Sequence, residues 1–587
     1  MRPALHALRQ ALSDADLFAY IIPRTDPHQS EYPAAYWDIL PWATGFTGSA
    51  GTLVVTADYA GLWTDSRYFL QAETQLAGTG VELVRLLTPH TPEFMGWIRE
   101  QAPAGARIGL DDRLISMARL REMEEAWPGL TVVPVDLVTD TWQERPALPL
   151  SPVVLHDISL AGVSCTDKLS QLRAGMQSRH LDYHLMVSLE DIAWTLNLRG
   201  DDVAYTPVFV GYLLVSATDA CLYADPAKLP APVCDYLSSH GVHTAPYESL
   251  TETLRTLPAD TRLGLDPAKT SGWIRRQLPE HVQVTAVPQL STALKARKNP
   301  TEIQHLRQAM RQDGVAWIRL LRWLEARVGQ EPISEVQVAE QLEAYRLTMP
   351  GYCGPSFPMI CGYLGNGAIV HYRAEPETAA QLQPEGLLLI DAGGQYTYGT
   401  TDMTRTLALG PVTRAMQEDF TRVLQGHIRL ASLVFPQGTQ GRQMDVLARQ
   451  ALWAAGLNYG HGTGHGVGAY LSVHEGPQSI SSASQVALEP GMLTSNEPGL
   501  YRTGAYGIRI ENLILCVPHL ETEFGVFYAF ETVSWCPIDR RLILPELLAP
   551  AEIAWLDAYH AQVRELLTPH LDAEEAAWLA AQTVPIT

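Results

Sequence analysis

Two aspartates lie where the sequence otherwise predicts a buried pair of strands. Residues 391–406 read DAGGQYTYGTTDMTRT, and the apolar runs 387–390 and 407–409 flank them. Apolar runs on both sides of a glycine-containing centre predict two antiparallel strands joined by a turn. Because a buried carboxylate is costly unless it is paired or binds a metal, Asp391 and Asp402 both need a partner.

The whole chain sets limits on the class of protein. It has 587 residues and a formal net charge of −22. Its length predicts three or four domains, and its acidity argues against nucleic acid or an anionic membrane surface as a partner. No apolar run of 18 residues predicts a membrane span, and the N-terminus lacks the pattern of a secretory signal. The seven scattered cysteines contain no CxxC pair, which favours a reducing cytoplasm over a disulfide framework or a thiolate zinc site.

Two stretches indicate domain boundaries, one rich in proline at 139–152 and one charged at 292–302. They divide the chain into the domains 1–145, 146–297 and 298–587. Residues 52–65 and 212–225 share a strand–turn–strand pattern that ends in aspartate, which predicts two related α/β domains. The third part predicts a helix with Thr301 as its N-cap, helices over 414–435 and 439–452, a final helix after Pro550, and strands between them. We therefore expect two α/β domains followed by an α+β domain.

Further polar residues cluster after the aspartate hairpin. The stretch HGTGHGVGAYLSVH carries His461, His465 and His474, an excess over what composition predicts. Two short sequences follow, NEPG with Glu497 and GIRIEN with Arg509 and Glu511. Alternation in the second sequence predicts one strand with Arg509 and Glu511 on the same face.

Each residue alone has a simpler interpretation, such as a turn aspartate, a loop histidine or a cross-strand salt bridge. As an ordered set they form an oxygen-rich group with one imidazole, which suits Mn²⁺, Co²⁺, Fe²⁺ or Zn²⁺. Four carboxylates carry too much charge for one divalent ion. Two ions about 3.5–4 Å apart, with a water between them, would balance it. The set comprises Asp391, Asp402, His465, Glu497 and Glu511.

The order of these motifs resembles the five-ligand signature of the pita-bread dinuclear metallopeptidases. The words DAGGQYTYGTTDMTRT, HGTGHGVG, NEPG and GIRIEN look like the Xaa-Pro aminopeptidase branch. DPHQSEY at 26–32, GFTGSAGT at 45–52 and WTDSRYFLQA at 63–72 resemble the first domain of its long, three-domain cytosolic form. The resemblance implies two creatinase-like N-terminal domains, then a pita-bread catalytic domain with a C-terminal extension.

The resemblance also implies a role for each matching residue. Asp391 would bind one metal, Asp402 and Glu511 would bridge both, and His465 and Glu497 would complete the second. Glu497 would also carry a proton from the bridging water. His371 would lie near the scissile bond, His474 would contact the substrate carbonyl, and His461 would line the proline side. Tyr501 and Arg509 would relay protons or orient the bridging carboxylates.

The implied activity is hydrolysis of the N-terminal Xaa-Pro bond of short peptides with proline at the second position. The implied cofactors are two divalent ions, Mn²⁺ first, with Co²⁺ or Zn²⁺ as alternatives. A cytoplasmic homodimer formed through the catalytic domain is also implied.

Three other interpretations compete with this one. A prolidase would cut dipeptides, but prolidases of this family usually carry one N-terminal domain. A creatinase would lack the metal ligands. A silent pita-bread module that binds proteins would also have lost them, whereas all five ligands are present here.

Overall fold

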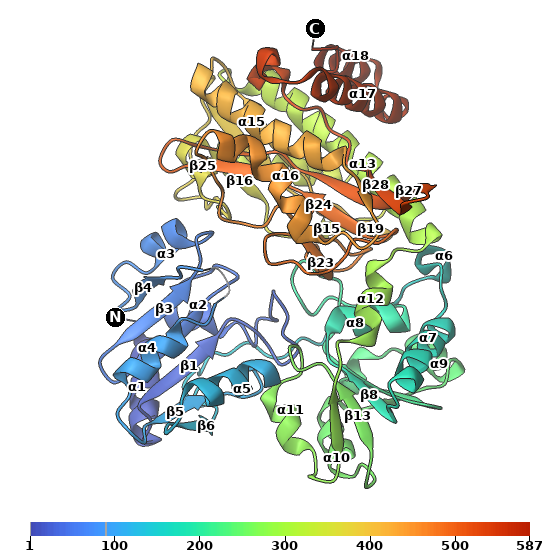
Figure 1. The fold of residues 1–587 in the computed structure, drawn as a ribbon. Coiled ribbons are helices and arrows are strands. Elements are labelled where there is room, and N and C mark those ends of the chain that lie inside the picture. The colour runs from blue at the N-terminus through green and yellow to red at the C-terminus, as the bar shows by residue number, and fades with distance from the viewer. Residues whose placement is uncertain (1, 89–90, 587) are drawn as a thin grey trace. The chain divides into compact units, whose positions relative to one another are not determined.

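The computed structural model describes residues 2–88 and 91–586, which form two compact units. The first unit comprises Met1–Ile158 and Val163–Thr292, and the second comprises Ser159–Gly162 and Ala293–Thr587. Figure 1 shows both units as ribbons with their elements labelled. None of the helices in the described part of the chain is long and apolar enough to cross a membrane.

The first unit contains the same six-stranded sheet twice. The strand orders are β4-β3-β2-β1-β5-β6 and β12-β11-β10-β8-β13-β14. In both sheets the third strand is antiparallel to its two neighbours, and the remaining pairs are parallel. The structure thus confirms the repeat predicted from 52–65 and 212–225, which form the β2–β3 and β10–β11 hairpins. The strands are β1 Ala19–Pro23, β2 Thr52–Thr56, β3 Ala60–Thr64, β4 Glu82–Arg85, β5 Arg107–Leu110, β6 Thr131–Pro134, β8 Tyr183–Met186, β10 Tyr212–Ser216, β11 Ala220–Tyr223, β12 Val242–Ala245, β13 Arg262–Leu265 and β14 Gln283–Ala286, with a separate pair, β7 Val154–Leu155 and β9 Leu198–Arg199.

Helices bury both faces of these sheets. Along β1, Tyr20 and Ile22 lie in one apolar cluster and Ile21 in the other, because successive strand residues point to opposite faces. The helices in this part of the chain are α1 Pro3–Asp14, α2 Ile39–Thr44, α3 Phe69–Gln75, α4 Phe94–Gln101, α5 Met117–Ala126, α6 Ile158–Ala161, α7 Cys165–Ser178, α8 Leu189–Leu196, α9 Ala231–Ser239, α10 Leu250–Arg255, α11 Gly272–Gln277 and α12 Leu290–Ala296.

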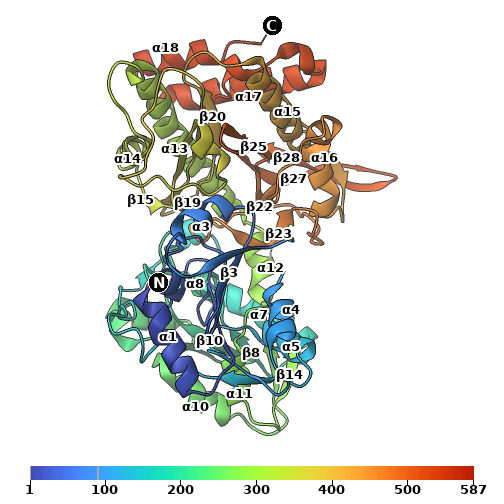
Figure 2. The ribbon, with the colours of Figure 1, turned by 90° about the vertical axis from the view of Figure 1, so that its left-hand side faces the viewer.

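The second unit combines antiparallel strands with long helices. Its largest sheet has the order β21-β28-β27-β24-β22-β23, and a three-stranded sheet has the order β16-β17-β20. Helices α15 and α16 pack side by side over the strands (Figure 1), and the β27–β28 hairpin projects from its sheet (Figure 2). The helices are α13 Pro300–Arg327, α14 Glu335–Arg346, α15 Arg414–Ala431, α16 Gly441–Ala454, α17 Pro550–Leu567 and α18 Ala573–Gln582. The strands are β15 Tyr352–Pro355, β16 Ile360–Tyr363, β17 Leu387–Asp391, β18 Gly394–Tyr396, β19 Gly399–Thr400, β20 Thr404–Ala408, β21 Val434–Pro436, β22 Gly464–Gly466, β23 Glu475–Ile480, β24 Leu493–Asn496, β25 Gly499–Arg502, β26 Tyr506–Arg509, β27 Asn512–Thr522 and β28 Gly525–Thr532.

Several predicted boundaries need correction. The helix predicted from Thr301 has Asn299 as its N-cap, because the Asn299 side chain accepts from the backbone of Thr301 and Glu302. The stretch 292–302 is not an open linker, since α12 continues to Ala296. Helix α15 ends at Ala431, before the short strand β21. Helix α18 follows α17 and was not predicted.

Candidate metal centre

The predicted aspartate hairpin forms, with an insertion. Strands β17 and β20 pair antiparallel, and Asp391 at the end of β17 lies opposite Thr404. Between them, β18 and β19 form a smaller hairpin that joins β15 in another sheet. Asp402 lies between this insertion and β20. Asp391 is 7% exposed and Asp402 4% exposed, so both carboxylates are as buried as the sequence predicts.

His465 approaches Asp402 from the other sheet. It lies on β22, where a Cβ atom on the adjacent Gly464 would come within 1.9 Å of the Ser495 carbonyl oxygen. Glycine is therefore required for the close packing of β22 on β24. The His465 Nδ1 lies 3.0 Å from the Gly466 carbonyl oxygen, to which it can donate. This contact orients Nε2 toward Asp402, as such outer contacts do for metal-binding histidines.

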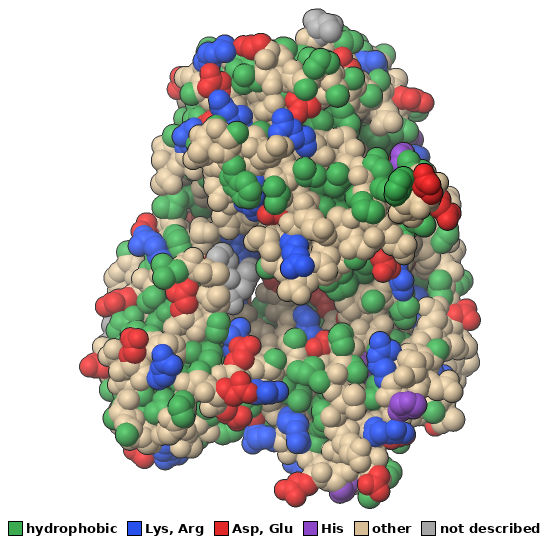
Figure 3. All heavy atoms as spheres, viewed as in Figure 1, with side chains coloured by type: hydrophobic (Ala, Val, Ile, Leu, Met, Phe, Trp, Pro, Cys, Tyr) green, Lys and Arg blue, Asp and Glu red, His purple; other side chains and the backbone are tan. Residues whose placement is uncertain are grey.

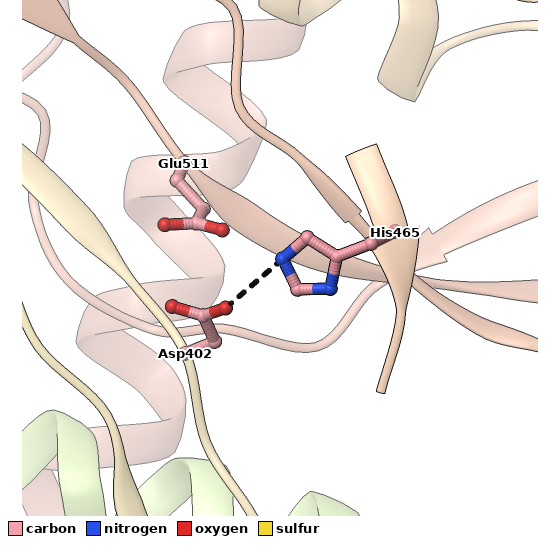
Figure 4. A group of neighbouring side chains, drawn as sticks. All are labelled: Asp402, His465 and Glu511. Carbon is pink, nitrogen blue, oxygen red and sulfur yellow. Dashed lines mark ion pairs between the residues drawn. The ribbon is translucent and has the colours of Figure 1, made fainter. Parts of the chain in front are cut away.

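Three of the predicted ligands form one cluster. Single ligand atoms of Asp402, His465 and Glu511 all lie within 4.8 Å of one another. Figure 4 shows the two carboxylates and the ring pointing toward a common centre. His465 Nε2 lies 3.4 Å from Asp402 Oδ2 and 3.6 Å from Glu497 Oε1, so Glu497 borders the same cluster.

Arg509 and Glu511 do not share a strand as predicted. Strand β26 ends at Arg509 and β27 begins at Asn512, so Glu511 lies in the break between them. Arg509 donates to Asp391 Oδ2 at 2.6 Å, and Glu511 accepts from the Thr404 hydroxyl at 2.7 Å. Despite the break, both side chains contact the Thr404 hydroxyl, which also accepts from Arg509 Nε at 3.2 Å.

Burial and mutual repulsion dominate the electrostatics of the cluster. Burial raises the pKa of Asp391, which Arg509 lowers and Asp402 raises further. Burial, then the carboxylates of Asp402, Asp391 and Glu497, raise the pKa of Glu511 well above its usual value.

The pKa values of Glu497 and His465 are also shifted from their usual values. Burial raises the pKa of Glu497 to about 7 although His465 and Arg509 lower it. Burial lowers the pKa of His465, but the carboxylates of Asp402 and Glu497 outweigh it and bring the value to about 9. Carboxylates that share a buried site cannot all ionise unless cations are present.

A buried acceptor without a donor also indicates that the site suits divalent cations. Asp391 Oδ1 is buried and has no hydrogen-bond donor. An acceptor that is buried without a donor is costly, and cation binding would remove that cost. Three carboxylates and one imidazole beside this oxygen are the donors that first-row divalent ions bind.

An outer chain of hydrogen bonds joins three more of the predicted residues. Arg509 donates to the Tyr501 hydroxyl oxygen at 2.7 Å, and that hydroxyl lies 2.8 Å from His461 Nε2. His461 Nδ1 lies 2.7 Å from the Gly462 carbonyl oxygen, to which it can donate. This leaves Nε2 to accept from Tyr501. The chain connects Asp391 to His461 through Arg509 and Tyr501.

The remaining two predicted residues lie at the margin of the cluster. The ring of His474 is exposed and meets the His465 ring edge-on, with ring centroids 4.3 Å apart. His371 is partly buried, and the carbonyl of its neighbour Val370 lies 3.5 Å from Arg509 Nη2.

Sequence reasoning missed two hydroxyl residues beside the ligands. Thr404 donates to Glu511 and accepts from Arg509 Nε at 3.2 Å. The Ser495 hydroxyl accepts from the backbone N–H of His465 and lies 3.4 Å from Glu497 Oε1. Each lies two positions from a predicted ligand, but a buried hydroxyl is ordinary in a strand and gave no signal of its own.

Family models match most of the chain. Residues 304–518 match metallopeptidase family M24, and 526–586 match the C-terminal region of that peptidase family. Residues 5–142 and 144–302 each match the creatinase/prolidase N-terminal domain. These matches confirm the predicted fold class of two creatinase-like α/β domains and a pita-bread catalytic domain.

Individual relatives cover the full length. Aminopeptidase P2 of Arabidopsis thaliana is 38% identical and covers 99% of this chain and 88% of its own. A probable Xaa-Pro aminopeptidase P of Fusarium vanettenii is 39% identical over 99% and 98% of the two chains. Among solved structures, X-prolyl aminopeptidase from Caenorhabditis elegans, described as a cytosolic enzyme with a dinuclear active site, matches with a TM-score of 0.94. It is 31% identical and covers 99% of each chain.

A dipeptidase shares only the fold. The Xaa-Pro dipeptidase from Bacillus anthracis covers 64% of this chain, with a TM-score of 0.52 and 23% identity. The full-length relatives decide the family: this chain belongs to the aminopeptidase P family of metallopeptidases.

Proposed function

We propose that this chain is an Xaa-Pro aminopeptidase that hydrolyses the first peptide bond of short peptides with proline at the second position. The observation that carries the proposal is the convergence of Asp402, His465 and Glu511 within 4.8 Å, in a family whose relatives span the whole chain. The predicted domains 1–145, 146–297 and 298–587 belong to the same proposal, supported by the family matches that end near 142 and 302.

We propose two divalent cations as cofactors, Mn²⁺ before Co²⁺ or Zn²⁺. Asp391 would bind one, Asp402 and Glu511 would bridge both, and His465 with Glu497 would complete the second. When bound, the cations would lower the pKa of a shared water, so that hydroxide is available at neutral pH. The buried oxygen of Asp391 that lacks a donor supports this assignment.

Protein side chains would transfer the proton, bind the carbonyl oxygen and position Asp391. Glu497 would take a proton from the attacking water and deliver it to the proline nitrogen as the C–N bond breaks. His474, which is exposed beside His465, would donate a hydrogen bond to the carbonyl oxygen as it gains charge. Arg509 and Tyr501 would hold Asp391 in place through the hydrogen bonds described above.

The bond that is cut explains why proline can be accommodated at the second position. The nitrogen of an Xaa-Pro bond is a tertiary amide without N–H, so the site needs no acceptor there. His371 would lie near the scissile bond, and His461 would line the proline side. A homodimer formed through the catalytic domain is part of the same proposal. A location in the cytoplasm would match the worm relative, which is described as cytosolic.

Two tripeptides test the proposal. Mn²⁺-loaded protein is incubated with Arg-Pro-Pro or Arg-Ala-Pro, and the products are identified by mass spectrometry. We expect release of arginine from Arg-Pro-Pro alone. The dipeptide Arg-Pro serves as a third substrate, because a prolidase would cut it and leave the tripeptide intact. Failure to cut any of the three after loading with Mn²⁺, Co²⁺ or Zn²⁺ would contradict the enzymatic assignment.

A further inference from the structure

The segment that carries His371 has little regular structure of its own. It connects β16 to β17, and beyond Tyr363 its only regular element among the described residues is a short 3₁₀ helix, Leu364–Ala368. A side chain that is to act on a substrate must be held within a fraction of an ångström. The contacts that hold this segment therefore decide where His371 lies.

One buried carboxylate binds four residues of the segment. Glu335, the first residue of α14, has no exposed surface. Its oxygens accept from the backbone N–H of Tyr363 at 2.7 Å and of Ala380 at 2.8 Å. They also accept from the Tyr372 hydroxyl at 2.8 Å and from Asn366 Nδ2 at 3.0 and 3.2 Å. All these donors are neutral amides or a hydroxyl, and they come from the start, middle and end of 363–380.

His371 lies between two anchored neighbours. On one side, Tyr372 donates its hydroxyl to Glu335 and its backbone N–H to the Ile369 carbonyl at 3.0 Å. On the other side, the Val370 carbonyl faces Arg509, which also binds Asp391. The backbone at His371 is thus tied both to Glu335 and to the arginine that orients a proposed metal ligand.

Close packing of glycines restricts the position of the 363–380 segment. A Cβ atom on Gly507 of β26 would lie 1.7 Å from the Gly367 carbonyl oxygen, and a Cβ atom on Gly362 would lie 2.7 Å from Gly367. The 3₁₀ helix therefore lies directly on the strand that carries Arg509. A shift of the segment away from Glu335 would alter the position of His371 relative to that strand.

We propose that Glu335 is a positioning residue that holds His371 for peptide hydrolysis, acting through Tyr372 and the 363–380 segment without touching the substrate. This inference rests on the proposed aminopeptidase function. Removing the carboxylate would leave several buried donors without an acceptor, and the segment would relax to satisfy them. Such a misplacement costs catalysis more than substrate binding, because the reacting groups lose alignment.

The variant Glu335→Gln tests this with little change in volume. The NH₂ of the new amide would face N–H or O–H donors that the carboxylate oxygen had accepted from. We therefore expect kcat for Arg-Pro-Pro to fall by about 100-fold, with a smaller change in KM. Bound metal should be unchanged. Glu340→Gln, on an exposed residue of the same helix, is the matched control and should keep wild-type kinetics.

A double-mutant comparison separates positioning from general stability. If Glu335 acts through His371, the substitution Glu335→Gln should cost under about threefold in a His371→Ala background, because coupled residues are not additive. An equal loss in both backgrounds would overturn the proposal. Wild-type kcat in Glu335→Gln would overturn it as well.

Hydrogen exchange supplies a readout that needs no turnover. We expect faster exchange across 363–380 in Glu335→Gln, with the rest of the second unit unchanged. The milder Tyr372→Phe removes one donor and keeps the carboxylate, so it should show a smaller change in the same segment even where the glutamine variant fails to fold. Unchanged exchange in Tyr372→Phe would contradict the anchoring. These data stand if the wild type cuts no peptide, a result that would count against the proposed function alone.

Discussion

Thr404 shows how a residue outside the ligand set can control it. Its hydroxyl donates to Glu511, which would bridge the two cations. The same hydroxyl accepts from Arg509, which also donates to Asp391. It is fully buried. Outer contacts of this kind orient ligating carboxylates, and their loss lowers metal affinity.

Thr404→Val keeps the shape of the side chain and removes its hydrogen bonds. We expect metal affinity or activity to fall by about 10–100-fold, measured by Mn²⁺ titration of activity on Arg-Pro-Pro. Thr404→Ser keeps the hydroxyl and is the matched control, which should stay near wild type. Equal behaviour of the two variants would show that the hydroxyl has no part in holding Glu511.

At the scale of single residues, the sequence predicted the site where residue types are unusual for their surroundings. Buried carboxylates and clustered histidines were visible because such residues are costly or rare in apolar surroundings. Thr404 and Ser495 were not, because a buried hydroxyl is ordinary in a strand. Alternation also does not reveal the strand break at 510–511, which leaves Glu511 outside both β26 and β27.

At the scale of elements, a buried charge cluster joins α12 to β23. Lys295 and Lys298 both donate to Glu475, the residue after His474, and all three side chains are at most 5% exposed. Lys295 Nζ lies 2.5 Å from Glu475 Oε2. One carboxylate thus offsets part of the charge of two ammonium groups that have little access to water.

Glu475→Gln would remove the negative charge that lies beside both buried ammonium groups. We expect the second unit to lose about 3–5 kcal/mol of stability, seen as a lower melting temperature of that unit. Arg297→Gln breaks a nearby pair with Glu489 in which both side chains are about half exposed, and it should change stability by less than about 1 kcal/mol. A melting temperature of Glu475→Gln equal to that of the control would contradict the assigned role.

Elements were predictable where the local pattern was complete. The helices predicted over 439–452 and after Pro550 follow from apolar spacing, and the two matching hairpins follow from their shared pattern. The β18–β19 insertion was not predictable, because its pairing with β15 is a contact between distant segments. The cap at Asn299 was missed because Thr301 is also a good capping residue.

At the scale of the whole molecule, both signs of charge are interspersed on the face shown in Figure 3. Buried neutral histidines make stability depend on pH. Burial lowers the pKa of His184 to about 4. Its Nδ1 lies 3.2 Å from the Gly264 carbonyl oxygen and its Nε2 accepts from the backbone N–H of Leu290, so a second ring proton would break the latter contact.

The pH dependence follows from this lowered pKa. Unfolded His184 binds a proton below about pH 6.5, whereas folded His184 does so only below about 4. Between these values the unfolded state holds more protons, so stability is lost as the pH falls through this window. We expect the melting temperature of the first unit to fall less between pH 7 and 5 in His184→Asn than in wild type. Parallel pH profiles for the two proteins would contradict the assignment of a neutral buried ring.

We propose that Asp391 and Asp402 are buried because two cations neutralise them. The most direct test is to count metal ions per chain by mass spectrometry of elements, after loading with Mn²⁺ and removal of free metal. We predict two ions per wild-type chain and fewer in Asp402→Ala, which should also lose activity on Arg-Pro-Pro. Retention of no metal by the wild-type chain at saturation would contradict this assignment of two cations, as would two ions and normal turnover in Asp402→Ala.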